Sequence, residues 1–256
     1  MLLDQLVLFI VALAANTLSA LAGGGAGLLQ LPALIFLGLP FAIALATHKI
    51  ASVALGVGAT LRHLRAGSLD PKLVLMLLAA GLPGVWLGAR WILEVDESLA
   101  TIALGVMTLA IGLYSWRRPD LGQATTAVRP GAAAMMIGLG VLFVAGVLNG
   151  SLTSGTGLIV TLWLVRWFGL DYKTAVAHTL VLVGLGWNGT GALTLGVLGE
   201  IAWDWLPALL IGSLIGGYLG AHLAIKGGNR LIKRIFEVVT VLTGCSLILR
   251  GLASIG

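Results

Sequence analysis

Long runs of apolar residues, separated by short polar stretches, follow one another along the whole chain. A helix needs roughly 20 apolar residues, at ~1.5 Å of rise each, to cross the hydrocarbon core of a bilayer. The pattern therefore predicts an all-α, polytopic helical membrane protein. Its eight long runs cover residues 2–22, 41–61, 73–93, 99–115, 132–148, 172–198, 203–225 and 235–249.

The pattern occurs twice. A shift of 130 residues places glycines and a histidine of the first half on identical residues of the second, and a shift of 132 does the same for two later glycines. The aligned pairs are Gly25/Gly155, Gly27/Gly157, His48/His178, Gly84/Gly216 and Gly88/Gly220. Small residues four positions apart, as in the last two pairs, let membrane helices approach closely. We therefore predict a first transmembrane repeat at 1–116, a cytoplasmic connector at 117–131 and a second repeat at 132–256.

Each repeat opens with an apolar stretch that a glycine-rich turn interrupts, at 23–27 and at 153–157. The turns leave two short apolar pieces, 26–38 and 156–168, which either span the membrane fully or re-enter it. Each repeat is then a broken hairpin followed by three spans, up to ten segments in all. Paired interruptions at matching places in two halves indicate a transport site.

The charged residues between the runs indicate how the halves are oriented. The loops 62–72 and 226–234 are basic, whereas their counterparts in the other repeat, 196–204 and 90–98, are acidic. Short cytoplasmic loops are enriched in Lys and Arg. Equivalent loops should therefore face opposite sides of the membrane, which predicts two inverted repeats with both termini outside.

Composition agrees with a membrane protein: 59% of the residues are hydrophobic and 10% are charged, whereas soluble domains carry about 25% charge. The net charge of +5 comes from residues scattered between the spans, so we expect it to orient the chain and not to bind nucleic acid. The single cysteine, Cys245, permits no internal disulfide or CxxC pair, and we expect neither a metal nor a cofactor. The start, Met1–Gln5, lacks the basic region of a signal peptide, so the first run should be retained as a span.

The two glycine-rich turns are the first candidate for binding chemistry. Glycine adopts positive φ and lets backbone approach a ligand, and a helix that starts after such a break presents free N–H groups and the positive end of its dipole. These features favour a site for a small anion; close helix packing through small residues is the structural alternative. The candidate residues are Gly23, Gly24, Gly25 and Gly27 in the first turn, and Thr153, Ser154, Gly155, Thr156 and Gly157 in the second.

The second candidate is a pair of histidines well inside predicted spans, with the residue that follows each one. These positions are His48-Lys49 and His178-Thr179. Lys49 has no acidic residue nearby in sequence, so a substrate anion could balance its charge; alternatively, its side chain snorkels to the surface. The histidines either form structural hydrogen bonds or contact the ligand and handle protons. Asn149 and Asn188 are further candidates.

The motifs just described resemble those of the sulfite exporter TauE/SafE family, also called the toluene-sulfonate uptake permeases. The resemblance covers nearly the whole chain. It rests on Ala22-Gly23-Gly24-Gly25-Ala26-Gly27, Pro32, Ala46-Thr47-His48-Lys49, Asn149-Gly150, Ser154-Gly155-Thr156-Gly157 and Ala177-His178-Thr179. It implies a carrier of the bacterial inner membrane for sulfite, sulfoacetate or other sulfur-containing or organic anions, driven by the proton gradient or the membrane potential.

We therefore expect a secondary transporter that moves such an anion by alternating access, with export as the expected direction and proton coupling through the histidines. An anion channel on the same scaffold is one alternative. The other is an intramembrane serine hydrolase with Ser154 as nucleophile and His178 or His222 as base. Against the hydrolase, Leu152 stands where a GxSG motif needs glycine, and the first repeat has Gly24 in place of Ser154.

Overall fold

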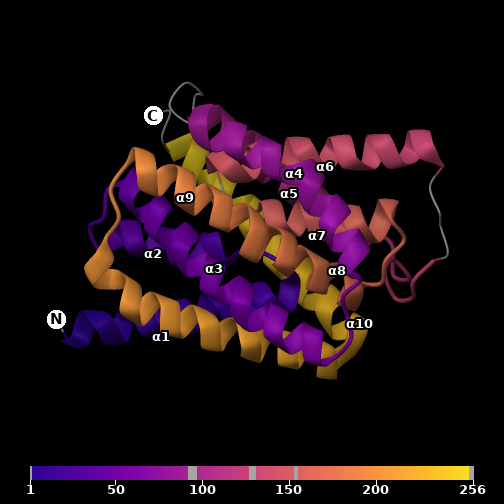
Figure 1. Cartoon of the computed structure of the whole chain (residues 1–256), viewed down its shortest axis with the longest axis horizontal. Helices are drawn as coiled ribbons and strands as arrows, with labels where there is room; N and C mark the ends of the chain where they lie inside the picture. Colours follow the sequence, from indigo (N-terminus) through magenta and orange to yellow (C-terminus); the bar gives the residue numbers. More distant parts are fainter. Residues whose placement is uncertain (1, 92–96, 127–130, 153–154, 254–256) are drawn as a thin grey trace.

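The computed structural model describes residues 2–91, 97–126, 131–152 and 155–253, which form a bundle of helices without strands (Figure 1). The first repeat supplies α1 (Leu2–Ala22), α2 (Ala26–Phe36), α3 (Phe41–Arg65), α4 (Pro71–Trp91) and α5 (Glu97–Trp116). The second supplies α6 (Ala132–Leu152), α7 (Thr156–Trp167), α8 (Tyr172–Thr179), the π-helix η1 (Leu180–Trp187), α9 (Asn188–Leu198), the short 3-10 turn η2 (Trp203–Trp205) and α10 (Leu206–Ala253).

Six helical segments of the described chain are long and apolar enough to cross a membrane, which confirms a polytopic helical membrane protein. The segment α8–η1–α9 is one such continuous pass, and α5 contributes a shorter apolar stretch, Thr101–Trp116. The helix α10 contains two passes, because Gly228 (φ 69°, ψ −177°) turns the chain in its middle. Counting those two passes separately, the eight predicted runs all form helices.

The predicted basic loop at 226–234 is the largest departure from the expected boundaries. Helix runs up to Gly228 and resumes directly after it, so Arg230, Lys233 and Arg234 lie on a helix and not in an open loop. An ion pair between Lys233 and Glu237, one turn apart, supports that helix. Helix α3 likewise continues past residue 61 to Arg65. Basic side chains in its last turn interact favourably with the negative end of the helix dipole.

The second arm of each opening hairpin is shorter than a typical transmembrane helix. The 11 residues of α2 and the 12 of α7 reach only about 16–18 Å, against the ~30 Å of a hydrocarbon core. The α1–α2 hairpin opens toward the end of the bundle where α9 connects to α10, and the α6–α7 hairpin opens toward the opposite end (Figure 1). The start of α1 and the end of α10 lie at the same end of the bundle, as an inverted arrangement requires.

Glycines set the closest helix contacts, and they do so in the same way in both halves. A Cβ atom on Gly216 of α10 would lie 2.7 Å from the carbonyl oxygen of Leu13 in α1. One on Gly84 of α4 would lie 2.2 Å from the carbonyl oxygen of Phe143 in α6. Side chains larger than hydrogen cannot fit at these positions, so the expected close approach of small residues is confirmed.

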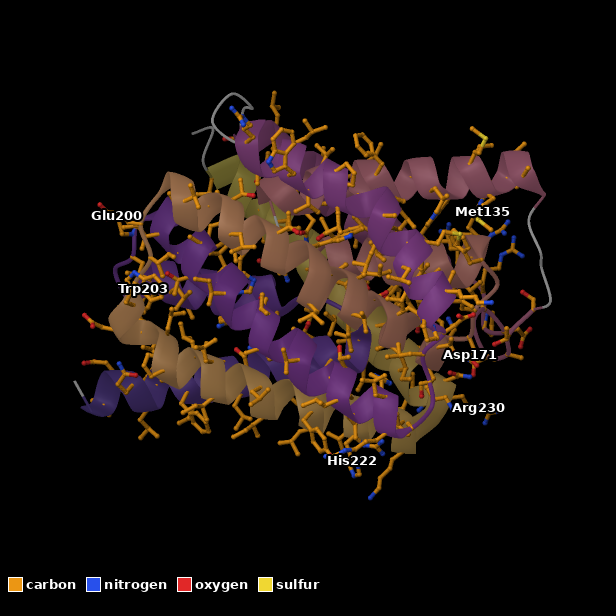
Figure 2. All side chains as sticks on the ribbon, viewed as in Figure 1. Met135, Asp171, Glu200, Trp203, His222 and Arg230 are labelled. Carbon is orange, nitrogen blue, oxygen red and sulfur yellow. The ribbon has the colours of Figure 1, made fainter. Side chains whose placement is uncertain are left out.

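The stretch after α5 is folded against the bundle and is more than a linker. The amide of Thr126 donates to the carbonyl of Gly169 at 2.8 Å, and the amide of Tyr172 donates to the carbonyl of Gly122 at 2.9 Å. These bonds hold it on the turn between α7 and α8. Asp171 and Arg230 lie at this end of the bundle, whereas Glu200 and Trp203 lie at the other (Figure 2). The charge pattern assigns the first of these ends to the cytoplasm.

Candidate functional site

The two interrupted segments meet in the interior of the bundle. A Cβ atom on Gly24 would lie 2.7 Å from the carbonyl carbon of Gly157, and one on Gly157 would lie 2.9 Å from the Cα atom of Gly24. The backbones of the two breaks are therefore in direct contact, and any side chain at either position would separate them. Backbone outside regular helix is tolerated at membrane depth when it is buried in protein or lines a cavity.

Each half-helix begins at a glycine in the left-handed region. Gly25 precedes α2 with φ 100° and ψ 5°, and Gly155 precedes α7 with φ 82° and ψ −19°. Within the described residues no side chain of the N-cap residue caps either helix. The first amides of a helix have no partner within it, and they carry the positive end of its dipole. The geometry therefore suits a bound anion, worth up to ~2 kcal/mol from the dipole alone at a partly buried site.

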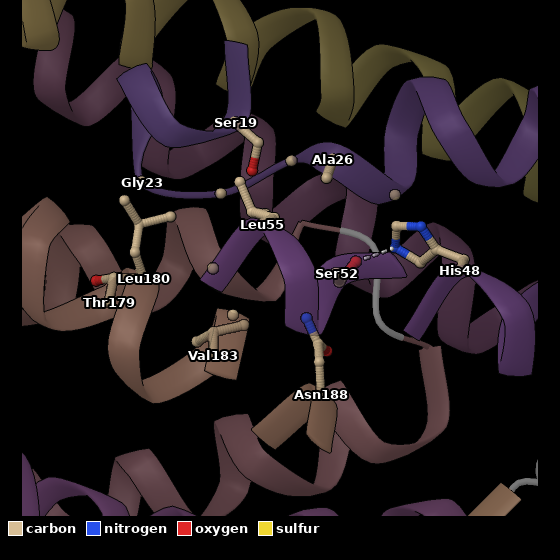
Figure 3. A pocket seen from close by; sticks show the side chains of 15 residues that line it. Ser19, Gly23, Ala26, His48, Ser52, Leu55, Thr179, Leu180, Val183 and Asn188 are labelled. Carbon is tan, nitrogen blue, oxygen red and sulfur yellow. Dashed lines mark hydrogen bonds between the residues drawn. The ribbon is translucent and has the colours of Figure 1, made fainter. Parts of the chain in front are cut away.

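A small pocket, with a cavity volume of about 30 Å³, lies beside the first break (Figure 3). Eight of its lining residues are among those the sequence singles out: Gly23, Gly24, Gly25, Gly27, His48, Gly157, Thr179 and Asn188. The others are Ser19, Ala26, Ser52, Leu55, Leu180, Val183 and Gly184. Both halves of the chain thus contribute to one small pocket, although the second break contributes only Gly157.

The pocket contains buried polar atoms with unused hydrogen-bonding capacity. His48 Nε2 lies 3.2 Å from the hydroxyl of Ser52, one helical turn further along α3 (Figure 3). His48 Nδ1 and the side-chain oxygen of Asn188 are buried and have no hydrogen-bond partner among the described residues. Leaving a buried polar atom unpaired costs about 1–3 kcal/mol. A polar ligand or water in the pocket would remove that cost.

Lys49 is completely buried (0% exposed) but does not line the pocket. Its Nζ donates to the carbonyl oxygen of Asn149 at 2.8 Å, and its chain packs on Gly191, where a Cβ atom would lie 2.9 Å from Lys49 Cδ. Snorkelling to the surface is therefore excluded. No carboxylate of the described chain forms an ion pair with this side chain, so a positive charge on its amine has no counter-charge among the described residues.

Equivalent positions of the two repeats each reach the break of the other half. Lys49 of the first repeat bonds to the backbone just before the second break. At the matching position, the hydroxyl of Thr179 is hydrogen-bonded to that of Thr161 at 3.0 Å, and Thr161 donates to the carbonyl of Gly23 at 2.9 Å. The two halves are therefore joined crosswise at the interrupted segments, through a charged bond on one side and a hydroxyl pair on the other.

Other predicted residues lie away from the pocket. The Asn149 side chain donates to the hydroxyl of Thr156 at 2.9 Å, so both belong to the second break itself. Gly155 faces Thr108 of α5. Thr153 and Ser154 lie outside the described residues. Asn149, Thr156 and Gly155 do not line the pocket.

His178 does not line the pocket either. Its Nδ1 pairs with the carbonyl of Thr174 at 2.8 Å, and its Nε2 accepts from the amide of Asp70 at 3.2 Å, at the start of α4. His63, in the last turn of α3, is also fully buried, and neither ring nitrogen has a partner among the described residues. The sequence pattern did not single out His63; its only signal was a histidine inside a basic last turn.

Ser52 and the π-helix η1 were also not predicted from the sequence pattern. Ser52 could have been found, because it lies four residues after His48 and so shares its helix face. The π-helix supplies Leu180, Val183 and Gly184 to the pocket. Single-turn π-bulges are frequent at functional sites. A Cβ atom on Gly56 would lie 2.5 Å from the backbone of Gly184, so α3 and η1 touch directly beside the pocket.

A model of the family described as "Sulfite exporter TauE/SafE" matches residues 8–247, nearly the whole chain. The chain belongs to this family. Similar curated proteins include a "Probable membrane transporter protein" of Haemophilus influenzae, 30% identical over 94% of this chain and 93% of its own length. YfcA of Escherichia coli is 28% identical over 94% of this chain and 88% of its own, and YunE of Bacillus subtilis is 25% identical over 97% and 98%. Both are also named probable membrane transporter proteins. No solved structure matches.

Membership of the family and the apolar helices together make this chain a membrane transporter, a multi-pass protein of the cell inner membrane. The names of the relatives describe transport and not catalysis.

Proposed function

We propose that this chain is a secondary transporter that moves a small sulfur-containing or organic anion, of the sulfite or sulfonate type, across the inner membrane by alternating access, in the direction of export. The observation that carries the proposal is the pocket at the first break. There an uncapped helix start at a left-handed glycine meets buried polar atoms that have no protein partner. The family description, with its reference to sulfite, supports the substrate class.

The donors around the pocket match the oxygens of such an anion. The first amides of α2 supply N–H groups, and the hydrogen-bonded pair of Ser52 and His48 keeps one further proton that can be donated. The amide of Asn188 lies across the pocket from the first break (Figure 3). Lys49 adds a positive charge outside the lining. At an effective dielectric constant of about 20, a nearby unit charge is worth several kcal/mol to an anion. The cavity volume of about 30 Å³ is far below the ~300–1,000 Å³ typical of ligand pockets, so in this conformation the pocket has room only for a small solute.

Alternating access needs two halves that can move against each other around a fixed site. In this proposal the contact between Gly24 and Gly157 is the place where the halves slide, because it joins bare backbone without interlocking side chains. His48 carries the coupled proton, since it is an ionisable group that lines the pocket within the membrane. Substrate and proton would then cross together or in exchange as one half rocks against the other.

Flux of radiolabelled sulfite in proteoliposomes tests the proposal. We expect saturable uptake that supports counterflow, and we expect Ser52→Ala and Asn188→Leu to reduce it by about tenfold or more, the loss of ~1.4 kcal/mol of binding. The matched control is Thr194→Val, on the same membrane pass as Asn188, because the Thr194 hydroxyl bonds only to the carbonyl of Thr190 in its own helix. Wild-type flux in both pocket variants would refute the site, and flux without saturation or counterflow would indicate a channel.

A further inference from the structure

A second binding site lies at the basic end of the bundle, between α5 and the second pass of α10. Two depressions adjoin there and share Trp116, Arg234 and Glu237. The first is an apolar groove between the two helices. The second is a polar depression below the stretch that follows α5. Neither contacts the transport pocket: their lining residues and those of the pocket do not overlap.

The apolar groove faces the hydrocarbon region. It is lined by Gly112 of α5 and by Val238, Val241 and Leu242 of α10, and two of these side chains are largely exposed, Val238 by 60% and Leu242 by 66%. From Arg234 to Leu242 the helix rises by about 12 Å, at ~1.5 Å per residue. The groove therefore runs from the membrane surface toward the bilayer centre, at the depth of a lipid acyl chain.

The polar depression carries a positive charge. Its cations are Arg230, Lys233 and Arg234, and its carboxylates are Asp120 and Glu237, which leaves one net positive charge. Lys233 is ion-paired with Glu237 and donates to the carbonyl of Ser115 at 2.6 Å. The charges of these two side chains therefore balance each other. Across the described chain neither Arg230 nor Arg234 has an ion-pair partner.

Two further groups suit the level of the lipid headgroups. Trp116, which is 70% exposed, stands where the two depressions join, and tryptophan prefers the membrane–water interface. Gln123 lines the polar depression, and its side-chain nitrogen is buried without a hydrogen-bond partner among the described residues. It can donate to an oxygen that the protein does not supply.

We propose that these two depressions form one binding site for an anionic phospholipid of the cytoplasmic leaflet. Arg230 and Arg234 bind the phosphate, Gln123 donates to the headgroup, and one acyl chain lies in the groove over Gly112. Basic pockets between helices on the cytoplasmic side recognise anionic headgroups, and guanidinium groups bind phosphate oxygens through paired hydrogen bonds. A lipid fits better than a free phosphate ion because the charged depression continues into an apolar groove.

Thermal stabilisation of the purified full-length protein by added lipid tests the site, since a ligand that binds only the folded form raises the melting temperature. Phosphatidylglycerol should stabilise the protein more than phosphatidylcholine of the same acyl chains. Arg230→Ala and Arg234→Ala should each weaken the apparent affinity about fivefold, as expected for one arginine at an anionic surface. The matched control is Lys226→Ala, which removes one exposed positive charge from the same helix outside both depressions.

The groove is tested separately. Val238→Trp should fill it and lower the affinity for phosphatidylglycerol, whereas Leu249→Trp, at a similarly exposed position of α10 away from the groove, should not. Melting in lipid-free detergent shows whether each variant is folded. Equal effects of Arg234→Ala and Lys226→Ala, or equal stabilisation by the two lipids, would overturn the proposal. Stabilisation by soluble glycerol phosphate as strong as that by the lipid would also overturn it, in favour of a simple anion site.

Discussion

The two interrupted segments occupy equivalent places in the two repeats, but they differ in what surrounds them. The first consists of three successive glycines with positive φ, and its backbone lines the pocket. The second is supported by side chains: Asn149 bonds to Thr156, and Lys49 bonds to the carbonyl of Asn149. In the first break Gly23 and Gly24 donate to the carbonyl of Ser19, but the break still leaves the start of α2 facing the pocket. The second break is instead held by side chains and does not open on the pocket except at Gly157. An inverted fold can thus place the binding chemistry on one side of its symmetry axis and the structural support on the other.

The largest effect is expected at Gly24, where a substitution brings both a clash with neighbouring backbone and a strained φ. A control glycine with strain alone distinguishes the two causes. In Gly24→Ala the new methyl group would lie 2.7 Å from the backbone of Gly157, and φ is already 153°. In the control, Gly38→Ala, φ is 108° but nothing lies within 4 Å. We expect the control to lose about 1–2 kcal/mol from strain alone, and Gly24→Ala to lose several kcal/mol and all transport. Thermal melting in detergent, followed by flux measurement, checks this; equal losses in both variants would mean that the breaks do not touch.

The second prediction concerns the charge at the second break. Lys49→Met keeps the length of the side chain but removes the uncompensated ammonium group. We expect sulfite flux to fall at least about tenfold, equivalent to ~1.4 kcal/mol. The loss of stability should be no more than about 1–3 kcal/mol, the cost of leaving the Asn149 carbonyl unpaired. Lys226→Met, at an exposed position, is the control for lost charge. Unchanged flux in Lys49→Met would remove the charge from the mechanism.

The smallest effect concerns the hydroxyl that joins the two halves. In Thr161→Val the carbonyl of Gly23 loses its donor across the interface. We expect a loss of about 1 kcal/mol of stability and a reduced rate of transport. Thr17→Val is the matched control, because the Thr17 hydroxyl bonds to the carbonyl of Leu13 in its own helix and joins nothing else. A larger melting shift in Thr17→Val than in Thr161→Val would contradict the crosswise connection.

Much of the architecture could be predicted because membrane insertion depends on simple quantities. Apolar length identified the passes. The inversion that loop charge predicts stays a prediction. The repeated glycines identified both breaks, and Thr179 and Asn188 were named with them. Two details could not be read in this way. The acceptor of Lys49 lies 100 residues further along the chain, and periodicity reports which face of a helix is apolar, not which distant carbonyl it meets.

The π-helix was missed for a related reason. The stretch Leu180–Trp187 is uniformly apolar, so hydrophobic pattern cannot distinguish a wider helical turn from an ordinary one. Its counterpart in the first repeat, within α3, is an α-helix although the two align without any insertion. The contact between the backbones of Gly56 and Gly184 is a feature of tertiary packing at this place that the hydrophobic pattern does not report.

The bond between Lys49 and Asn149 also has a consequence for biogenesis. Ribosomes extend the chain from its amino end, so the early helices are inserted well before the acceptor carbonyl has been made. Until then the ammonium group must stay hydrated, in the lateral opening of the insertion machinery or near the headgroups. The early helices can settle into their mature arrangement only once the late ones arrive.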